Sequence, residues 1–132
     1  MGNYKVYPNK LKGKVKIPPS KSMAHRAVIC AALSNGLSKL TNIDYSDDII
    51  ATIDAMKSLG AIINKKDYYL EVIGIKSPDN KCKDIDSERI IDCNESGSTL
   101  RFLVPIAAIF DGANRFIGRG NLGKRPLDKI GR

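Results

Sequence analysis

Several features typical of nucleic-acid-binding, secreted and membrane proteins are scarce in this sequence. Tryptophan is absent and aromatic residues make up 6% of the 132 residues, so there is little material for a surface on which bases could stack. The three cysteines, Cys30, Cys82 and Cys93, are odd in number and lack paired spacing, which argues against a disulfide framework and against a zinc site. No apolar run approaches the ~20 residues that cross a bilayer.

These absences set the first expectations about location and partners. Residues 1–10 alternate polar and aromatic side chains and contain no apolar signal core. We therefore expect a cytoplasmic protein with no membrane partner. Cys30 lies in an apolar helical stretch, where we expect it to be a small buried hydrophobe.

Positive charge is in excess. The chain has 22 Lys and Arg residues against 14 Asp and Glu residues, a formal net charge of +8. This excess favours anionic partners but does not choose among nucleic acid, phosphorylated metabolites and anionic lipid. The hydrophobic fraction of 42% is enough for a folded core, and the length suits one ordinary domain.

Apolar periodicity and turn residues predict a mixed α/β chain. Three helices are expected behind serine caps, and they should end near Asn35, Gly60 and Phe110. The third begins near Ser98 and contains Pro105, a residue that belongs near a first turn or at a kink. Strands are expected over residues 15–17, 37–43, 61–64, 68–75, 90–93 and 115–118, a polar loop over 77–87, and a further helix from Pro126.

A weak internal repeat runs through this pattern. Residues 31–36 and 107–112 are similar, and in both places a serine-containing loop precedes a helix with an arginine, Arg26 or Arg101, then Ala-Ala, Gly and a strand. The helical pattern after Pro126 stops within about two turns, so we expect the chain to be part of a longer protein.

The first candidate site is Pro-Pro-Ser-Lys-Ser-Met-Ala-His-Arg at residues 18–26. The free N–H groups and the dipole of a helix start favour an anion, and Lys21 and Ser22 add a cation and a hydroxyl donor. Arg26 follows Ser22 by four residues on the same helical face, and its planar fork suits phosphate or carboxylate. The alternative is a capped helix with a solvated basic face.

Two further loops are candidates. Asn-Glu-Ser-Gly-Ser-Thr-Leu-Arg at residues 94–101 joins a strand to a helix, and Gly97 would let the backbone approach a ligand. The Gly-Lys-Ser/Thr core of a P-loop is absent there, and the alternative is a capped turn in which Gly97 only permits a positive φ. Residues 118–126 place three cations, Arg119, Lys124 and Arg125, among glycines before an expected helix start.

Together, Pro-Ser-Lys-Ser-x-x-His-Arg, Ser-Gly-Ser-Thr-x-Arg and Gly-x-x-x-Leu-x-x-Arg-Pro resemble the N-terminal signature of 5-enolpyruvylshikimate-3-phosphate synthases. The resemblance extends from Leu11 to Pro126. It implies the enolpyruvyl transferase fold, an α/β fold of two inside-out barrel domains built from repeated β-α-β-α-β-β units with the helices inside, here incomplete. Residues 18–132 would form most of the first units of the anion-binding domain, and residues 1–17 would belong or link to the other domain.

The resemblance also implies a reaction. The family transfers the enolpyruvyl group of phosphoenolpyruvate to the 5-hydroxyl of shikimate-3-phosphate and releases phosphate, on the way to chorismate and the aromatic amino acids, without a metal or organic cofactor. Lys21 would be catalytic, contacting both substrates and assisting proton movement, while Ser22 and Arg26 would hold shikimate-3-phosphate. The acid and base groups of the other domain are missing, so we expect the chain alone to be inactive.

The second and third motifs would hold phosphoenolpyruvate. Gly97 with its neighbour Ser98 would approach this substrate, at the place that the herbicide glyphosate occupies in this family, and Arg125 would pair with its anion. Many members carry Asn where this chain has Glu95, and we expect that carboxylate to point away from the substrate. For His25 we favour a structural role over proton transfer.

Three other interpretations compete with this one. The related UDP-N-acetylglucosamine enolpyruvyl transferases have Lys-Asn in place of Lys21-Ser22 and no matching His-Arg. A nucleic-acid-binding module fits the net charge, but the cations stand at helix starts and turns with few aromatic residues between them. A split or degenerate remnant with a scaffold role is the third.

Overall fold

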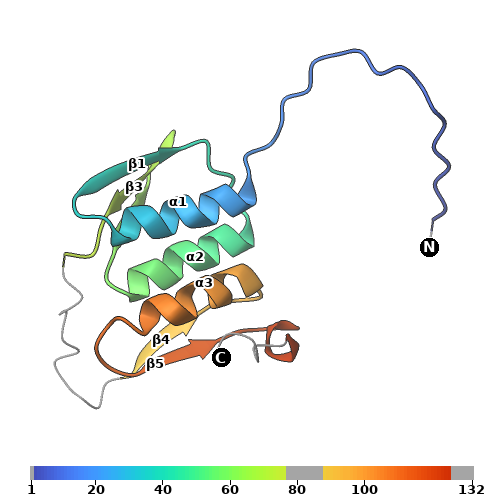
Figure 1. Cartoon of the computed structure of the whole chain (residues 1–132). Helices are drawn as coiled ribbons and strands as arrows, with labels where there is room; N and C mark the ends of the chain where they lie inside the picture. The colour runs from blue at the N-terminus through green and yellow to red at the C-terminus, as the bar shows by residue number, and fades with distance from the viewer. Residues whose placement is uncertain (1, 77–87, 126–132) are drawn as a thin grey trace.

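The computed structural model describes residues 2–76 and 88–125 (Figure 1). In chain order its elements are α1 (Lys21–Leu33), β1 (Leu37–Thr41), α2 (Asp47–Ser58), β2 (Ile62–Lys65), β3 (Tyr69–Ile73), β4 (Arg89–Asp92), α3 (Gly97–Ala107), β5 (Asn114–Ile117) and a 3₁₀ turn, η1 (Leu122–Lys124). The expected mixed α/β class is confirmed.

The three helices start at the same edge of the molecule. Figure 1 shows α1, α2 and α3 stacked in this order, all running in the same direction, with η1 beside the start of α3. Serine caps set two of these starts: Ser20 Oγ accepts from Met23 N at 3.4 Å, and Ser96 Oγ accepts from Thr99 N at 3.1 Å. The positive ends of three helix dipoles therefore share one edge.

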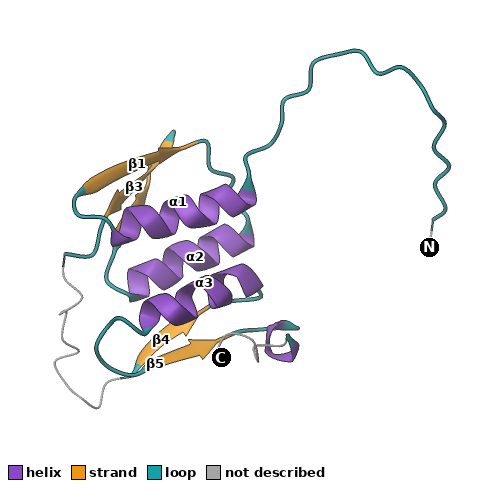
Figure 2. Cartoon of the chain, viewed as in Figure 1, coloured by secondary structure: helices purple, strands orange, loops and turns teal. Residues whose placement is uncertain are grey.

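Two small sheets support the helices (Figure 2). The first is antiparallel with the order β1-β3-β2, and the second is the parallel pair β4–β5, which α3 connects as a crossover. Leu40 pairs with Leu70 and Ile91 with Phe116 across the two ladders. The connection through α3 carries the chain from the end of β4 directly into the second motif.

One hydrophobic core joins both sheets to the helices. Its large fully buried side chains come from all three helices and from β3 and β4, and include Met56, Leu70, Val72, Ile91 and Leu103. Each contributes about 1.5–3 kcal/mol by leaving water. No helix in the described ranges is long and apolar enough to span a membrane.

Three sequence predictions about local structure are wrong. Residues 15–17 form no strand: they lie in an exposed arm, with Val15 86% and Ile17 82% accessible, and nothing in the described ranges pairs with them. Cys30 is exposed, because it lies opposite the helical face that buries Ala24, Val28 and Ala32.

Helix α3 also ends earlier than predicted. It stops at Ala107, so Pro105 lies in its last turn and not near its first, and Phe110 is buried in the segment that follows. The predicted loop over residues 77–87 and the predicted helix from Pro126 lie outside the described residues.

Candidate anion-binding site

The first motif forms the start of α1. Lys21 Nζ makes an ion pair with the carboxylate of Asp48 in the first turn of α2, and the two side chains remain 53% and 34% exposed. Pairs this exposed contribute only about 0–1 kcal/mol. The ammonium group is therefore oriented by Asp48 yet remains available to a ligand.

Arg26 lies one turn further along α1. Its Nη1 donates to the carbonyl oxygen of Ser22 at 3.2 Å, and its guanidinium lies 5.6 Å from the ring centroid of Phe102 on α3. The cation–π contact holds the exposed guanidinium over the helix layer. Ser22 is also exposed, so the two residues present a cation and a hydroxyl to solvent.

The structure brings the second and third motifs together. Gly97 is the first residue of α3 and is buried, and a Cβ added there would lie 2.5 Å from Nη1 of Arg125. The guanidinium thus lies against the glycine. Gly97 is not among the glycines with positive φ, so the alternative that it only permits a left-handed turn is wrong. Ser98 follows it in the first turn of α3 and is exposed.

Hydrogen bonds of Arg119 connect the third motif to the second motif and to the end of β4. Arg119 N donates to the carbonyl oxygen of Asn94 at 2.8 Å, and Arg119 Nη2 donates to Asp92 Oδ2 at 3.1 Å. The exposed carboxylate of Glu95 lies against Gly120, where an added Cβ would collide with it. That Glu95 points away from a bound substrate stays a prediction.

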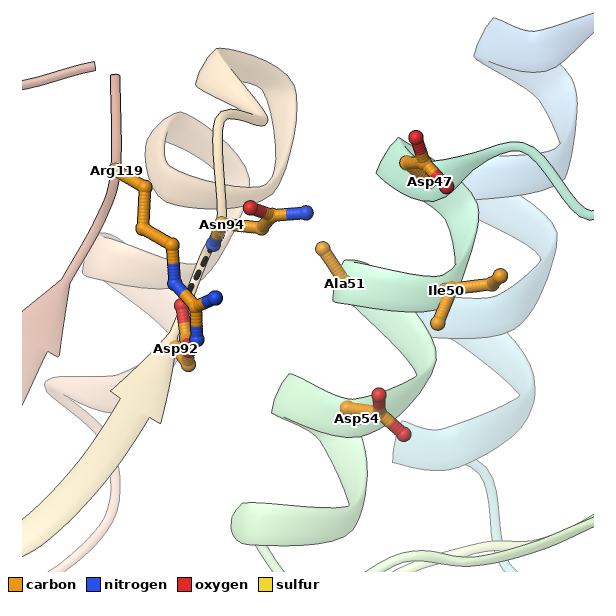
Figure 3. A pocket seen from close by; sticks show the side chains of 7 residues that line it. All are labelled: Asp47, Ile50, Ala51, Asp54, Asp92, Asn94 and Arg119. Carbon is orange, nitrogen blue, oxygen red and sulfur yellow. Dashed lines mark hydrogen bonds and ion pairs between the residues drawn. The ribbon is translucent and has the colours of Figure 1, made fainter. Parts of the chain in front are cut away.

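A hollow of about 220 Å³ next to this loop has a different chemistry. Figure 3 shows that it lies between α2 and the end of β4, and that Asp47, Asp54 and Asp92 face it together with Arg119. Its carboxylates suit no anion, and Lys21, Arg26 and Arg125 do not line it. The hollow is therefore separate from the predicted site.

A buried chain of hydrogen bonds connects the three helices, and the sequence did not predict it. His25 Nδ1 lies 2.7 Å from Thr52 Oγ1 on α2, which lies 2.8 Å from Thr99 Oγ1 on α3, and Thr99 Oγ1 donates to Ser96 Oγ at 2.7 Å. The available signal was a threonine inside the apolar face of α2, between Ile49 and Met56. These contacts agree with a structural role for His25.

Burial also shifts the pKa values of His25 and Cys93. Burial lowers the pKa of His25 below its usual 6.5; the charge of Asp48 opposes this shift, while Lys21 and Arg26 reinforce it. The imidazole is therefore neutral near pH 7. Burial, with a smaller effect of neighbouring Asp92, raises the pKa of the Cys93 thiol to about 11, which keeps that thiol unreactive.

Fold and site together define a class of protein. Three helix starts share one edge of a mixed α/β scaffold (Figure 1), with Lys21 at the start of α1 and the guanidinium of Arg125 against Gly97 at the start of α3. Unpaired N–H groups beside cations are an arrangement that favours an anionic ligand. The family model of EPSP synthase (3-phosphoshikimate 1-carboxyvinyltransferase) matches residues 6–132, and the chain belongs to this family.

Individual relatives agree with this assignment. A 3-phosphoshikimate 1-carboxyvinyltransferase of Clostridium beijerinckii is 77% identical over 129 residues, covering 97% of this chain and 30% of its own length. One from Clostridioides difficile is 67% identical over 132 residues, with the same two coverages. The chain spans 30% of the length of these two curated relatives.

The solved structures establish the fold. EPSP synthase from Acinetobacter baumannii superposes with a TM-score of 0.65 at 22% identity, covering 89% of this chain and 26% of that one. The mixed α/β architecture described here is thus that of EPSP synthases, incomplete relative to the full enzyme fold.

Proposed function

We propose that this chain forms part of an enzyme that transfers the enolpyruvyl group from phosphoenolpyruvate to the 5-hydroxyl of shikimate-3-phosphate. The observation that carries the proposal is the meeting of three motifs at one edge: Lys21 and Arg26 on α1, Gly97 at the start of α3, and Arg125 against Gly97. Both substrates are polyanions that repel each other, and fixed cations hold them together.

Within this proposal each group has a role. Lys21 contacts both substrates and assists proton movement, and its pairing with Asp48 orients the ammonium. Ser22 and Arg26 hold shikimate-3-phosphate. Ser98 lies with Gly97 at the start of α3, and the unpaired N–H groups of a helix start favour an anion.

Phosphoenolpyruvate binds in the other half of the site. Arg125 pairs with its anion, since the guanidinium already lies at the start of α3. Residues 18–132 form most of the first units of the anion-binding domain, and residues 1–17 belong or link to a second domain. That remaining part supplies the acid and base groups, and we place the enzyme in the cytoplasm.

A chimera tests this function. This chain replaces the matching segment of the Clostridium beijerinckii relative, and phosphate release is followed with both substrates, with each alone, and with UDP-N-acetylglucosamine as a competing acceptor. We expect turnover at ordinary enzyme rates, ~1–1000 per second, with shikimate-3-phosphate only, and none from the 132-residue chain by itself. A folded chimera without turnover, or one that prefers the nucleotide sugar, contradicts the proposal.

A further inference from the structure

The buried polar side chains form one connected set. In the described part of the chain, the buried polar residues are His25, Thr52, Ser96 and Thr99, each at most 1% exposed. All four belong to the hydrogen-bonded chain between the helices. A buried polar group is costly unless it is paired, so a connected set of this kind fixes the relative position of the elements that carry it.

Which group donates and which accepts along this chain depends on which ring nitrogen of His25 carries the proton. His25 Nε2 has no hydrogen-bond partner in the described residues, whereas Nδ1 faces Thr52. A buried unpaired N–H group is rarer than a buried unpaired acceptor, which favours the proton on Nδ1. Each hydroxyl can then donate to the next, from His25 through Thr52 and Thr99 to Ser96.

The two ends of this chain lie at the two halves of the site. At one end, His25 precedes Arg26 on α1 and follows Lys21 by one turn. At the other end, Ser96 caps α3, accepts from Thr99 N, and directly precedes Gly97. The hydrogen bonds thus link the start of α3 to the first motif.

We propose that His25 is a positioning residue: neutral and protonated on Nδ1, it holds the start of α3, and with it Gly97, in register with α1. This inference rests on the proposed function for its effect on catalysis. His25 touches no substrate. Loss of His25 removes the partner that the Thr52 hydroxyl has on α1. The start of α3, where phosphoenolpyruvate binds, is then held less firmly in place.

The catalytic test uses matched pairs in the chimera. His25→Leu removes the donor, while His25→Asn keeps an N–H donor close to the place of Nδ1. Thr99→Val keeps the shape of the side chain and removes its hydroxyl, while Thr99→Ser keeps the hydroxyl. We expect KM for phosphoenolpyruvate to rise about tenfold in the Leu and Val variants, as for a buried hydrogen bond left unmade. The Asn and Ser variants should stay within about twofold of the parent.

A stability control separates positioning from ordinary destabilisation. Val72→Ala removes buried methyl groups from β3, where the residue is fully buried in the hydrophobic core and takes no part in the polar chain. It should lower the melting temperature without raising KM for phosphoenolpyruvate. If His25→Leu behaves like Val72→Ala, or if His25→Asn is as impaired as His25→Leu, the positioning role is wrong.

A measurement on the 132-residue chain is independent of turnover. Long-range ¹H–¹⁵N NMR of the His25 ring at pH 7.5 should show a proton on Nδ1 and none on Nε2, and the amide shifts of Gly97 and Ser98 should change in His25→Leu but not in His25→Asn. The opposite tautomer, or unchanged amides, overturns the inference. An inactive parent chimera with this NMR result instead counts against the proposed function alone.

Discussion

Replacing Gly97 with alanine tests the contact between the second and third motifs. The added Cβ would lie 2.5 Å from Arg125 Nη1, closer than side chains tolerate, while Cδ and Cζ of Arg125 would lie at ordinary contact distances of 3.5 Å. Because the colliding atom is the far end of a flexible side chain, the guanidinium moves and the backbone does not. It has to retreat by about 1 Å to reach normal contact.

The magnitude follows from this displacement. A charge-assisted hydrogen bond contributes about 1.5–3 kcal/mol, and an extra methyl in a packed site costs about 1–3 kcal/mol. We therefore expect KM for phosphoenolpyruvate to rise about tenfold, or ~1.4 kcal/mol. The inhibition constant of the bulkier glyphosate should rise more. Since Gly97 is a helical residue without positive φ, alanine should raise stability by about 0.4–1 kcal/mol.

Three measurements on the chimera decide the matter: KM, the inhibition constant and the melting temperature. Gly123→Ala is the matched control, because Gly123 also lacks a positive φ and a Cβ there meets nothing within 4 Å. It should leave KM and the inhibition constant unchanged and raise stability by about the same 0.4–1 kcal/mol. In the double variant with Arg125→Ala, the alanine at 97 should add little to the effect of losing the arginine. A lowered melting temperature with an unchanged ratio of inhibition constant to KM would refute the reasoning.

Three further outcomes are expected. Arg26→Ala should lower kcat/KM for shikimate-3-phosphate about 10–150-fold, from the loss of a charge-assisted contact worth ~1.5–3 kcal/mol; near-normal efficiency removes this residue from the site. Because burial lowers the pKa of His25, the unfolded state binds more protons than the folded state. The free energy of unfolding should therefore decrease as the pH drops below about 6.5, the usual pKa of histidine. The charge of Asp48 opposes the pKa shift but does not reverse it. Urea unfolding from pH 7.5 to 5 measures this decrease. If the free energy of unfolding depends on pH equally steeply in His25→Asn, the prediction is wrong. Met56→Ala should cost about 2–5 kcal/mol of unfolding free energy, since the side chain is fully buried; a loss below ~1 kcal/mol in the same assay would show that the core collapses around the deletion.

The sequence predicted local features well because their causes are local. Helix α2 was expected between Ser46 and Gly60 and runs over Asp47–Ser58. Gly60 has a φ of 107°, and Ala61 N donates to the carbonyl oxygen of Met56 at 3.1 Å, the bond that closes a helix behind a left-handed glycine. Both signals lie within one or two residues of the helix ends.

Features that depend on distant partners were not predictable in the same way. Residues 15–17 alternate like a strand, but a strand needs a neighbour for its backbone groups. Within the candidate site, the motifs identified Lys21, Gly97 and Arg125. The hydrogen bonds of Thr52 join residues 27 and 47 positions away, and nothing in the local pattern of α2 identifies those partners.

The contact between Glu95 and Gly120 has an evolutionary consequence. Position 120 has a φ of 56°, which glycine adopts freely and asparagine or aspartate tolerate. The carboxylate of Glu95 occupies the space that a side chain at 120 would need. A homologue with a shorter residue at 95 frees that space, so the two positions should covary: asparagine at 120 should occur with small residues at 95, and glutamate at 95 only with glycine at 120.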